Sequence, residues 1–114
     1  EYLETYQIPF VFKDNTSQQS ISLSGEKRRV LFLIIKELLH NAIKHANCKA
    51  IRIEIYSQPQ TKIVFTEVGA KGFDPLQIKT QGNGLFNMSK WISGIHGTLN
   101  HERIENDMVS TIVW

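Results

Sequence analysis

The sequence predicts a single α/β domain, a two-layer sandwich in which helices pack on one face of a mixed β-sheet. Three observations support this prediction. Apolar residues recur at helical spacing in the segments 31–46 and 85–95. They alternate with polar residues in strand-like runs, of which 50–56 and 98–104 are the clearest. The length of 114 residues is that of one domain, and no internal repeat competes with this interpretation.

The composition excludes several classes of protein. Hydrophobic residues make up 41% of the chain and charged residues 21%, which is typical of a folded domain and not of a disordered segment. The net charge of +2 is too small to indicate nucleic-acid or membrane-surface binding by itself. A single cysteine, Cys48, excludes an internal disulfide. The longest apolar run, 30–35, is far shorter than the roughly 18 residues that a membrane span needs.

The first elements are two short strands and a long helix. Alternating apolar residues at 8–12 indicate an edge strand, because Pro9 cannot donate a hydrogen bond to a central ladder. A polar loop follows, and 21–23 alternates like a second short strand. Ser24 has the properties of a helix N-cap, with Glu26 in the first turn of the helix.

The long helix changes character along its length. Its core-facing stripe consists of apolar residues three or four positions apart, namely Leu31, Ile35, Leu38, Ala42 and Ala46. A second face starts with apolar residues and continues with polar ones, in the order Val30, Leu33, Ile34, Glu37, His40, Asn41, Lys44 and His45. The helix is therefore expected to begin in the core and to end at a polar surface.

A hairpin and a long loop follow the helix. Strands at 50–56 and 63–65 are joined by a short loop that contains Pro59, and we expect them to pair. The segment 67–84 holds four glycines and shows no sustained period, which indicates a loop that starts at a strand end and finishes at a helix. Loops in this position often bind ligands.

The end of the chain predicts a second helix and a closing hairpin. Apolar residues at 85, 88, 92 and 95 form a core-facing stripe, and the helix should stop near Gly97. Two strand-like runs follow at 98–104 and 108–114, and the short turn between them indicates a hairpin.

Polar residues on the long helix are candidates for phosphate and metal binding. Within about two helical turns, one surface brings together a carboxylate, an amide and two potentially cationic groups, those of Glu37, Asn41, Lys44 and His45. Mg²⁺ prefers oxygen ligands and is usually held by one or two protein groups together with substrate phosphates, which suits Asn41. A solvated helix face has the same pattern, and spacing alone favours that simpler interpretation.

Gly82-Asn83-Gly84 is a second candidate, this time for an anion. The segment stands directly before the second helix, where free backbone N–H groups and the helix dipole attract negative charge. The two glycines have no side chains to block a phosphate. Considered by itself, one short Gly-x-Gly is more often an ordinary turn into a helix.

Taken in order, three segments resemble the ATP-binding catalytic domain of bacterial two-component sensor histidine kinases. They are Glu-Leu-Leu-His-Asn-Ala-Ile-Lys-His-Ala at 37–46, Gly69 with Lys-Gly-Phe-Asp-Pro at 71–75, and Gly-Asn-Gly-Leu-Phe-Asn-Met at 82–88. The last segment is similar to the box of a short-lid subfamily. The resemblance implies the Bergerat-type fold of the GHKL ATPase superfamily, with 1–114 as one domain. Because the chain begins with Glu1 and not Met, we expect it to be a fragment of a longer receptor.

The resemblance implies a role for each matching residue. Asn41 would bind Mg²⁺, and Glu37 would orient or activate the groups around the γ-phosphate of ATP. Lys44 and His45 would contact phosphates, and 73–81 would form a short lid. The remaining nucleotide-binding positions would be Glu67, Gly69, Gly72, Gly82, Gly84, Leu85 and Ser110. Phosphoryl transfer depends mostly on positioning and charge stabilisation, which this set of residues can provide.

The second box departs from the family pattern. The family reads Asp-x-Gly-x-Gly, with the Asp carboxylate on the adenine amino group, whereas this chain reads Thr-Glu-Val-Gly-Ala-Lys-Gly at 66–72. If Gly69 is matched, Glu67 takes the place of the Asp. If 71–73 is matched, Val68 takes that place and no carboxylate is left. Both alignments remain open, and both predict weak or altered adenine binding.

The closing hairpin departs as well. The family tends to have Gly-x-Gly followed by Thr, whereas this chain reads Asp-Met-Val-Ser at 107–110, so that Ser110 preserves a hydroxyl group. We expect both departures to weaken nucleotide affinity more than they affect the fold. His101-Glu102 is similar to the dipeptide at which histidine kinases are phosphorylated, but we discount it because it lies on a predicted strand.

The resemblance implies a transferase domain that binds MgATP and supplies the γ-phosphate to a histidine on dimerisation helices of the same parent chain. A response regulator would act downstream, and the fragment alone would be inactive. We expect no nucleic-acid partner, no direct membrane contact by this domain, a cytoplasmic location, and a parent anchored in the inner membrane. Two alternatives remain: a degenerate module that docks or senses nucleotide, and a serine kinase that acts on a partner protein.

Overall fold

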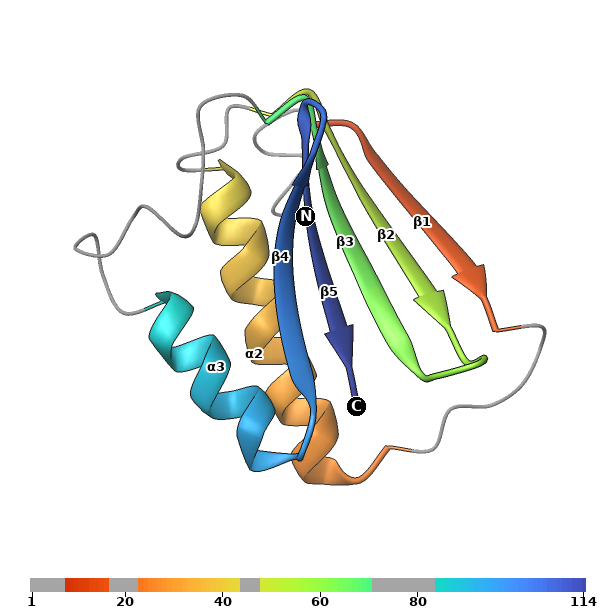
Figure 1. Cartoon of the computed structure of the whole chain (residues 1–114), viewed down its shortest axis with the longest axis vertical. Helices are drawn as coiled ribbons and strands as arrows, with labels where there is room; N and C mark the ends of the chain where they lie inside the picture. The colour runs from red at the N-terminus through yellow and green to blue at the C-terminus, as the bar shows by residue number, and fades with distance from the viewer. Residues whose placement is uncertain (1–7, 17–22, 44–47, 71–83) are drawn as a thin grey trace.

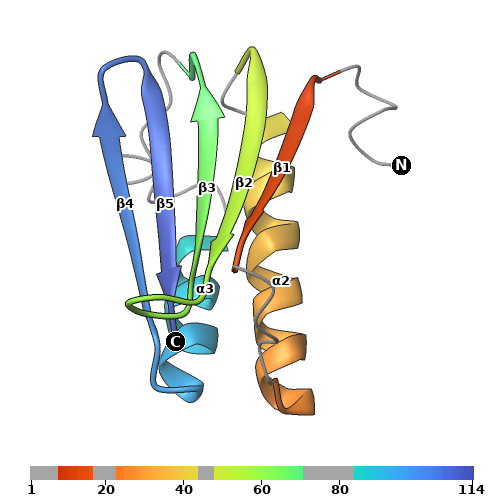
Figure 2. The ribbon, with the colours of Figure 1, turned by 90° about the vertical axis from the view of Figure 1, so that its right-hand side faces the viewer.

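The computed structural model describes residues 8–16, 23–43, 48–70 and 84–114. They form a five-stranded mixed sheet with the strand order β1-β2-β3-β5-β4, in which β1 and β2 are parallel and all other neighbours are antiparallel. The helices of the described part lie on one face of this sheet (Figures 1 and 2), which confirms the predicted sandwich. The elements are β1 (Phe10–Asn15), α2 (Gly25–Asn41), β2 (Ala50–Tyr56), β3 (Lys62–Val68), α3 (Gly84–Gly94), β4 (Thr98–Ile104) and β5 (Asp107–Val113).

α2 begins at the predicted N-cap. The Ser24 hydroxyl accepts a hydrogen bond from the backbone N–H of Lys27 at 3.2 Å, which satisfies one of the free donors of the first turn. The predicted stripe is confirmed at Leu31, Leu38 and Ala42, which are buried. The most deeply buried residue of the helix is Ile34, whereas Ile35 is only half-buried, so the centre of the contact is rotated slightly from the prediction. Ala46 lies outside the described residues.

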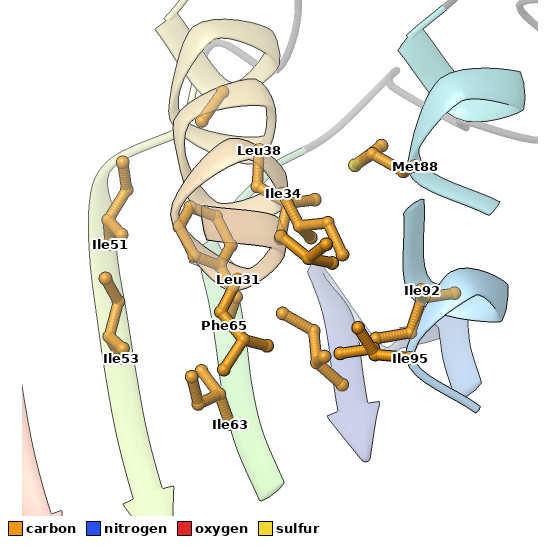
Figure 3. Close-up of a cluster of buried hydrophobic side chains, with 13 residues drawn as sticks. Leu31, Ile34, Leu38, Ile51, Ile53, Ile63, Phe65, Met88, Ile92 and Ile95 are labelled. Atoms are coloured by element: carbon orange, nitrogen blue, oxygen red, sulfur yellow. The ribbon is translucent and has the colours of Figure 1, made fainter. Parts of the chain in front are cut away.

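The core fills the space between α2, α3 and the central strands (Figure 3). Alternate residues of each central strand point toward the helices, as the two-residue period of a strand requires. Burial of one such aliphatic or aromatic side chain contributes roughly 1.5–3 kcal/mol to stability. The buried core residues are Val30, Leu31, Ile34, Leu38, Ala42, Ile51, Ile53, Ile63, Phe65, Met88, Ile92, Ile95 and Ile112.

β1 is an edge strand, as predicted, although it extends beyond the expected 8–12. Pro9 precedes the strand, and its carbonyl accepts the N–H of Ile51. The prediction of a strand at 21–23 is wrong at Leu23. This residue lies next to the N-cap of α2 and packs against the core. The other two residues of the predicted strand are outside the described part. The N-cap explains the difference, because Leu23 already belongs to the entry of the helix.

α3 ends in a Schellman motif, and the sequence predicts the position of this end only to within about a residue. The N–H of Gly97 donates to the carbonyl of Ile92 at 2.9 Å, and the N–H of His96 donates to that of Ser93 at 3.0 Å. The left-handed residue is His96, with φ of 59°, and not the predicted stop residue Gly97. A Cβ atom at Gly97 would lie 2.5 Å from the backbone oxygen of Val113, so this glycine is needed for close packing against β5.

Both predicted hairpins are present. β2 pairs with β3, and β4 pairs with β5 through a turn in which Glu105 has a positive φ of 56°. No helix in the described part of the chain has both the length and the apolar character needed to cross a membrane.

Candidate functional site

The structure describes most, but not all, of the predicted site residues. Lys44, His45, Gly72 and Gly82 lie outside the described residues, as does the predicted lid at 73–81. The remaining predicted residues come from α2, from the end of β3, from the start of α3 and from β5, and they are Glu37, Asn41, Glu67, Gly69, Gly84, Leu85 and Ser110.

Glu37 and Asn41 lie one turn apart on α2, and both are half-buried. Asn41 follows the fully buried Ile34 by seven residues, which places the two side chains on nearly the same side of the helix. The second face of α2 therefore changes from buried apolar to polar, as the sequence predicts, with Glu37 and Asn41 half-buried and His40 exposed. A carboxylate and an amide oxygen at this spacing are suitable ligands for a hard cation or for its water shell.

Glu67 is a buried carboxyl group on the helix-facing side of β3. It continues the alternation of Ile63 and Phe65, which belong to the core, and only 3% of its surface is exposed. Burial raises the pKa of Glu67 to about 7, although the positive charge of Arg103 opposes this shift. Val68 is half-buried and belongs to the opposite face. Of the two aligned positions, Glu67 is therefore the one that faces the helices.

Gly69 turns the chain away from β3 and requires the absence of a side chain. Its φ is +69°, and a Cβ atom would lie 3.2 Å from the side chain of Lys49. The backbone N–H of Gly69 donates to the Asp107 carboxylate at 2.9 Å. Next in the chain, Ala70 is fully buried against Met108. The start of the predicted ligand loop is thus fastened to β5 by a charged hydrogen bond.

Sequence reasoning missed this role of Asp107. From the sequence, Asp107 stands out only as a departure from the glycine that the family has there. Its function in the fold depends on the register of β3 against β5, which brings Asp107 beside the residue that follows Val68. No local sequence signal gives that register.

Ser110 lies on the helix-facing side of β5 and is paired with a histidine of β4. Its hydroxyl oxygen is 2.7 Å from Nδ1 of His101, and Ser110 is only 2% exposed. Burial lowers the pKa of His101, so the neutral imidazole is favoured. His101 was also missed as a site residue, because its sequence context was considered only as a phosphorylation dipeptide. The hairpin register, in which His101 is opposite Ser110, is the signal that identifies it.

The strand registers bring four polar side chains to one region of the sheet. In one row Phe65, Ser110 and His101 are neighbours on β3, β5 and β4. In the next row Glu67, Met108 and Arg103 are neighbours on the same strands. We call the four polar members, Glu67, Ser110, His101 and Arg103, the sheet cluster. It offers both donors and acceptors on the side of the sheet that faces the helices.

α3 starts at Gly84, as the sequence predicts, and its backbone places Leu85 in the first turn. Met88 is fully buried, and α3 packs beside α2 and next to β4. The first N–H groups of α3 have no partners within the helix itself, which is a general property of helix starts. The backbone N–H groups at this end of α3 are thus suited to bind an anion such as a phosphate.

The described residues contain no group of three or more His, Cys, Asp or Glu side chains that could hold a metal ion. The oxygen atoms of these residues fit a metal site that has few protein ligands. Mg²⁺ keeps several waters and is often bound by one or two protein oxygens together with phosphates. Asn41 and Glu37 provide such oxygens on one face of α2.

Comparison with curated proteins finds sensor histidine kinases. The chain is 33% identical over 78 residues to the signal transduction histidine-protein kinase/phosphatase UhpB of Salmonella typhimurium, which is 68% of this chain and 15% of that protein. It is 30% identical over 89 residues to the sensor histidine kinase ComP of Bacillus subtilis, which is 78% of this chain and 11% of that protein. The chain thus spans only a small part of these relatives.

Comparison with solved structures finds the same kind of protein. The histidine kinase AdeS of Acinetobacter baumannii has a TM-score of 0.75 at 17% identity, over 98% of this chain and 58% of that chain. The catalytic domain of the histidine kinase ThkA has a TM-score of 0.72 at 21% identity, over 98% of this chain and 80% of that chain. At these identities the likeness shows the fold.

No protein-family model matches the chain. The curated relatives nevertheless align with two thirds or more of it, and the solved catalytic domain aligns with nearly all of it. The aligned fold is the two-layer sandwich described above, with its mixed sheet and its helices on one face. From its sequence relatives and its fold, we conclude that this chain belongs to the family of catalytic domains of sensor histidine kinases.

Proposed function

We propose that the chain binds MgATP and supplies the γ-phosphate for phosphorylation of a histidine in a two-component sensor kinase. The observation that supports this most directly is the position of Glu37 and Asn41 on α2, where a buried apolar face becomes polar. Gly69 turns the chain at the end of β3, and α3 starts at Gly84 beside α2 in the helix layer. These features belong to a domain of the histidine-kinase family.

In this proposal the helix residues act on the phosphates. Asn41 would bind Mg²⁺ through its amide oxygen, and Glu37 would orient the groups around the γ-phosphate. Bound Mg²⁺ would offset the negative charge of the phosphates. Lys44 and His45 would contribute positive charge, and the backbone N–H groups of the glycines at 82 and 84 would donate hydrogen bonds to phosphate oxygens. Leu85 would contact the nucleotide from the first turn of α3.

The sheet residues act on the base. Glu67 and Ser110 both belong to the helix-facing side of the sheet, and Gly69 and Gly72 would shape the adenine end of the site. In the transfer step, the bond between the γ-phosphorus and the oxygen of the leaving ADP breaks. A P–N bond forms at the unprotonated ring nitrogen of the acceptor histidine, and the proton of its other ring nitrogen passes to solvent. The domain contributes mainly position and charge to this step.

The acceptor histidine and later partners would come from outside this domain. These two curated relatives are about seven and nine times longer than the segment that they share with this chain, since the shared segment is 15% of UhpB and 11% of ComP. We propose that the chain 1–114 is one domain of such a receptor and works with dimerisation helices of the same parent and with a response regulator. We also propose a cytoplasmic location for the domain and a membrane anchor elsewhere in the parent.

The test is a calorimetric titration of the chain with a non-hydrolysable ATP analogue, with and without Mg²⁺. Wild-type protein should bind at micromolar concentration only with Mg²⁺, and Asn41→Ala should weaken binding by roughly tenfold or more. Lys36→Ala, an exposed change on another face of α2, is the control and should bind like wild type. Absence of binding by the wild type at millimolar analogue would contradict the proposal.

Glu67 favours one alternative function, a degenerate module that docks or senses nucleotide without transfer. A buried carboxyl group with a pKa of about 7 is only partly ionised at neutral pH, so in part of the molecules it offers no carboxylate to the adenine amino group. Reconstitution of the full-length parent separates the two functions. Acid-labile phosphorylation of its own histidine supports the kinase, acid-stable phosphoserine supports a serine kinase, and nucleotide binding without phosphorylation supports the degenerate module.

A further inference from the structure

The sheet cluster contains a hydrogen bond that the proposed function does not by itself explain. Ser110 is nearly fully buried, and its hydroxyl oxygen is 2.7 Å from Nδ1 of His101 on the neighbouring strand. The two residues are directly opposite each other in the β4–β5 pair, so the backbone holds them in register. The hydroxyl of Ser110 therefore has one fixed partner within the protein.

We infer that His101 accepts the Ser110 proton and thereby leaves the Ser110 oxygen as a hydrogen-bond acceptor for the exocyclic amino group of the nucleotide base. This inference rests on the proposed function and adds a positioning residue to it. His101 would not touch the nucleotide and would act only through Ser110.

The separation of 2.7 Å places the Ser110 oxygen and Nδ1 of His101 in hydrogen-bond contact, and the tautomer of His101 decides which of the two donates. We take the Ser110 O–H as the donor and Nδ1 as the acceptor. In a neutral imidazole, an accepting Nδ1 requires the proton to be on Nε2. A serine hydroxyl has one proton, so once that proton points to His101 its oxygen can only accept from a ligand.

The position of Ser110 suits this role. Glu67, at the place of the family's Asp in one alignment, is opposite Met108, which makes Ser110 its diagonal neighbour on β5. Diagonal neighbours of an antiparallel pair are roughly 7–8 Å apart at the backbone, close enough for both side chains to reach one base. Because Glu67 is partly protonated at neutral pH, it offers a full carboxylate to an amino group in only part of the molecules. Ser110, whose hydroxyl group does not titrate in the neutral pH range, would supply a hydrogen-bond acceptor throughout that range.

Burial of Ser110 and Glu67 increases the difference in affinity between a base that has an exocyclic amino group and a base that lacks one. Glu67 and Ser110 are both nearly inaccessible to water in the folded chain. A buried polar group that is left without its partner costs more than a solvated one, so a base without an amino group should bind measurably worse. The expected selectivity is therefore for a 6-aminopurine over a purine that has only hydrogen at that position.

The experiment compares two non-hydrolysable triphosphate analogues, one with adenine and one with unsubstituted purine. In calorimetric titrations with Mg²⁺, wild-type chain should prefer the adenine analogue by roughly tenfold. His101→Leu should weaken this preference several-fold, because the Ser110 hydroxyl can then turn its proton toward the base, and should leave affinity for the purine analogue nearly unchanged. His101→Asn, whose amide oxygen can accept the Ser110 proton, should retain the preference. Asn100→Leu, on the exposed opposite face of the same strand, is the matched control and should behave like wild type.

A second readout does not require nucleotide. The ¹⁵N chemical shifts of the His101 ring should show the proton on Nε2, and Ser110→Ala should change the Nδ1 shift. An undiminished adenine preference in folded His101→Leu, or a proton on Nδ1 in the wild type, would overturn the inference while leaving the proposed function intact. If His101→Leu does not fold, the ring shifts and the Ser110→Ala titration still decide the question. If wild type binds neither analogue, the proposed function fails and this inference fails with it.

Discussion

At Glu67 the fold favours a neutral carboxyl group, whereas the proposed adenine contact requires an ionised carboxylate. Its helix-facing position continues the core alternation of β3, and burial there disfavours the charged carboxylate. The pKa of about 7, compared with an ordinary value of 4.5, means that the folded chain binds a proton more tightly than the unfolded chain. The free energy of unfolding should therefore fall as pH rises between these values, by up to about 3 kcal/mol.

We predict that Glu67→Gln removes this part of the pH dependence. Glutamine is neutral in both states, so the variant should gain stability over wild type at pH 8 and lose most of that gain at pH 4. The measurement is urea unfolding of both proteins at pH 4, 6 and 8. The difference between the two proteins is the relevant quantity, because the lowered pKa of His101 makes wild-type stability rise with pH in the range below its ordinary 6.5. An equal pH slope in both proteins would contradict the assignment to Glu67.

Asp107 is a second residue whose role can be tested alone. Asp107→Ala removes the acceptor of the Gly69 N–H, which is 2.9 Å away, and should cost about 1–3 kcal/mol of stability, a typical value for a bond to a charged group. Asp107→Asn keeps an acceptor oxygen and should cost less. Glu102→Ala removes an exposed carboxylate from the same hairpin and serves as the control in the same unfolding measurement. Equal effects of Asp107→Ala and Glu102→Ala would show that the bond to Gly69 does not stabilise the turn.

At the scale of elements, substitutions at two adjacent positions at the end of α3 should change the stability of the chain in opposite directions. His96 adopts a left-handed conformation, which costs a non-glycine residue roughly 1–2 kcal/mol. His96→Gly should therefore stabilise the chain by about 1 kcal/mol. Gly97→Ala should destabilise it by about 1–3 kcal/mol, because the new methyl group would lie 2.5 Å from the Val113 oxygen. Thermal unfolding measures both, and a gain from Gly97→Ala would contradict the packing of this turn against β5.

The same turn illustrates what sequence reasoning can and cannot predict about an element. The apolar period identified α3 and its approximate end, because the period follows from packing on one face. It could not decide between His96 and Gly97, because the choice depends on the approach of β5, which is distant in sequence. Leu23 is a different case, because the N-cap at Ser24 follows from the sequence and already makes Leu23 the residue before the helix, which argues against a strand there.

At the scale of the whole molecule, the fold could be predicted further than the site. Binary patterns predicted both hairpins and the sandwich, because each pattern reflects the burial of one face, and Pro9 predicted the edge position of β1. The helix part of the candidate site, Glu37 and Asn41, also followed from a local period. The partners on the sheet did not, because the contacts of Asp107 with Gly69 and of His101 with Ser110 depend on strand register.

Phe65 tests the whole architecture, because it lies on the central strand β3 at the contact between the sheet and α2 (Figure 3). Phe65 has no exposed surface, whereas Phe12 on the edge strand β1 is 52% exposed, so the chain contains a matched pair for one substitution. Phe65→Ala should cost roughly 3–5 kcal/mol through lost burial and the cavity that remains. That is a large fraction of the roughly 5–15 kcal/mol that stabilises a typical domain.

Phe12→Ala removes the same atoms from a position that keeps much of its contact with water, so we expect a cost of less than about 1 kcal/mol. Urea unfolding of both variants gives the comparison, provided that the dependence on urea concentration stays the same as in wild type. If the sandwich is packed as described, the cost at position 65 exceeds that at position 12 several-fold. Similar costs would mean that β1 is covered in solution or that the contact between β3 and α2 is loose, and either result would require a different packing of the two layers.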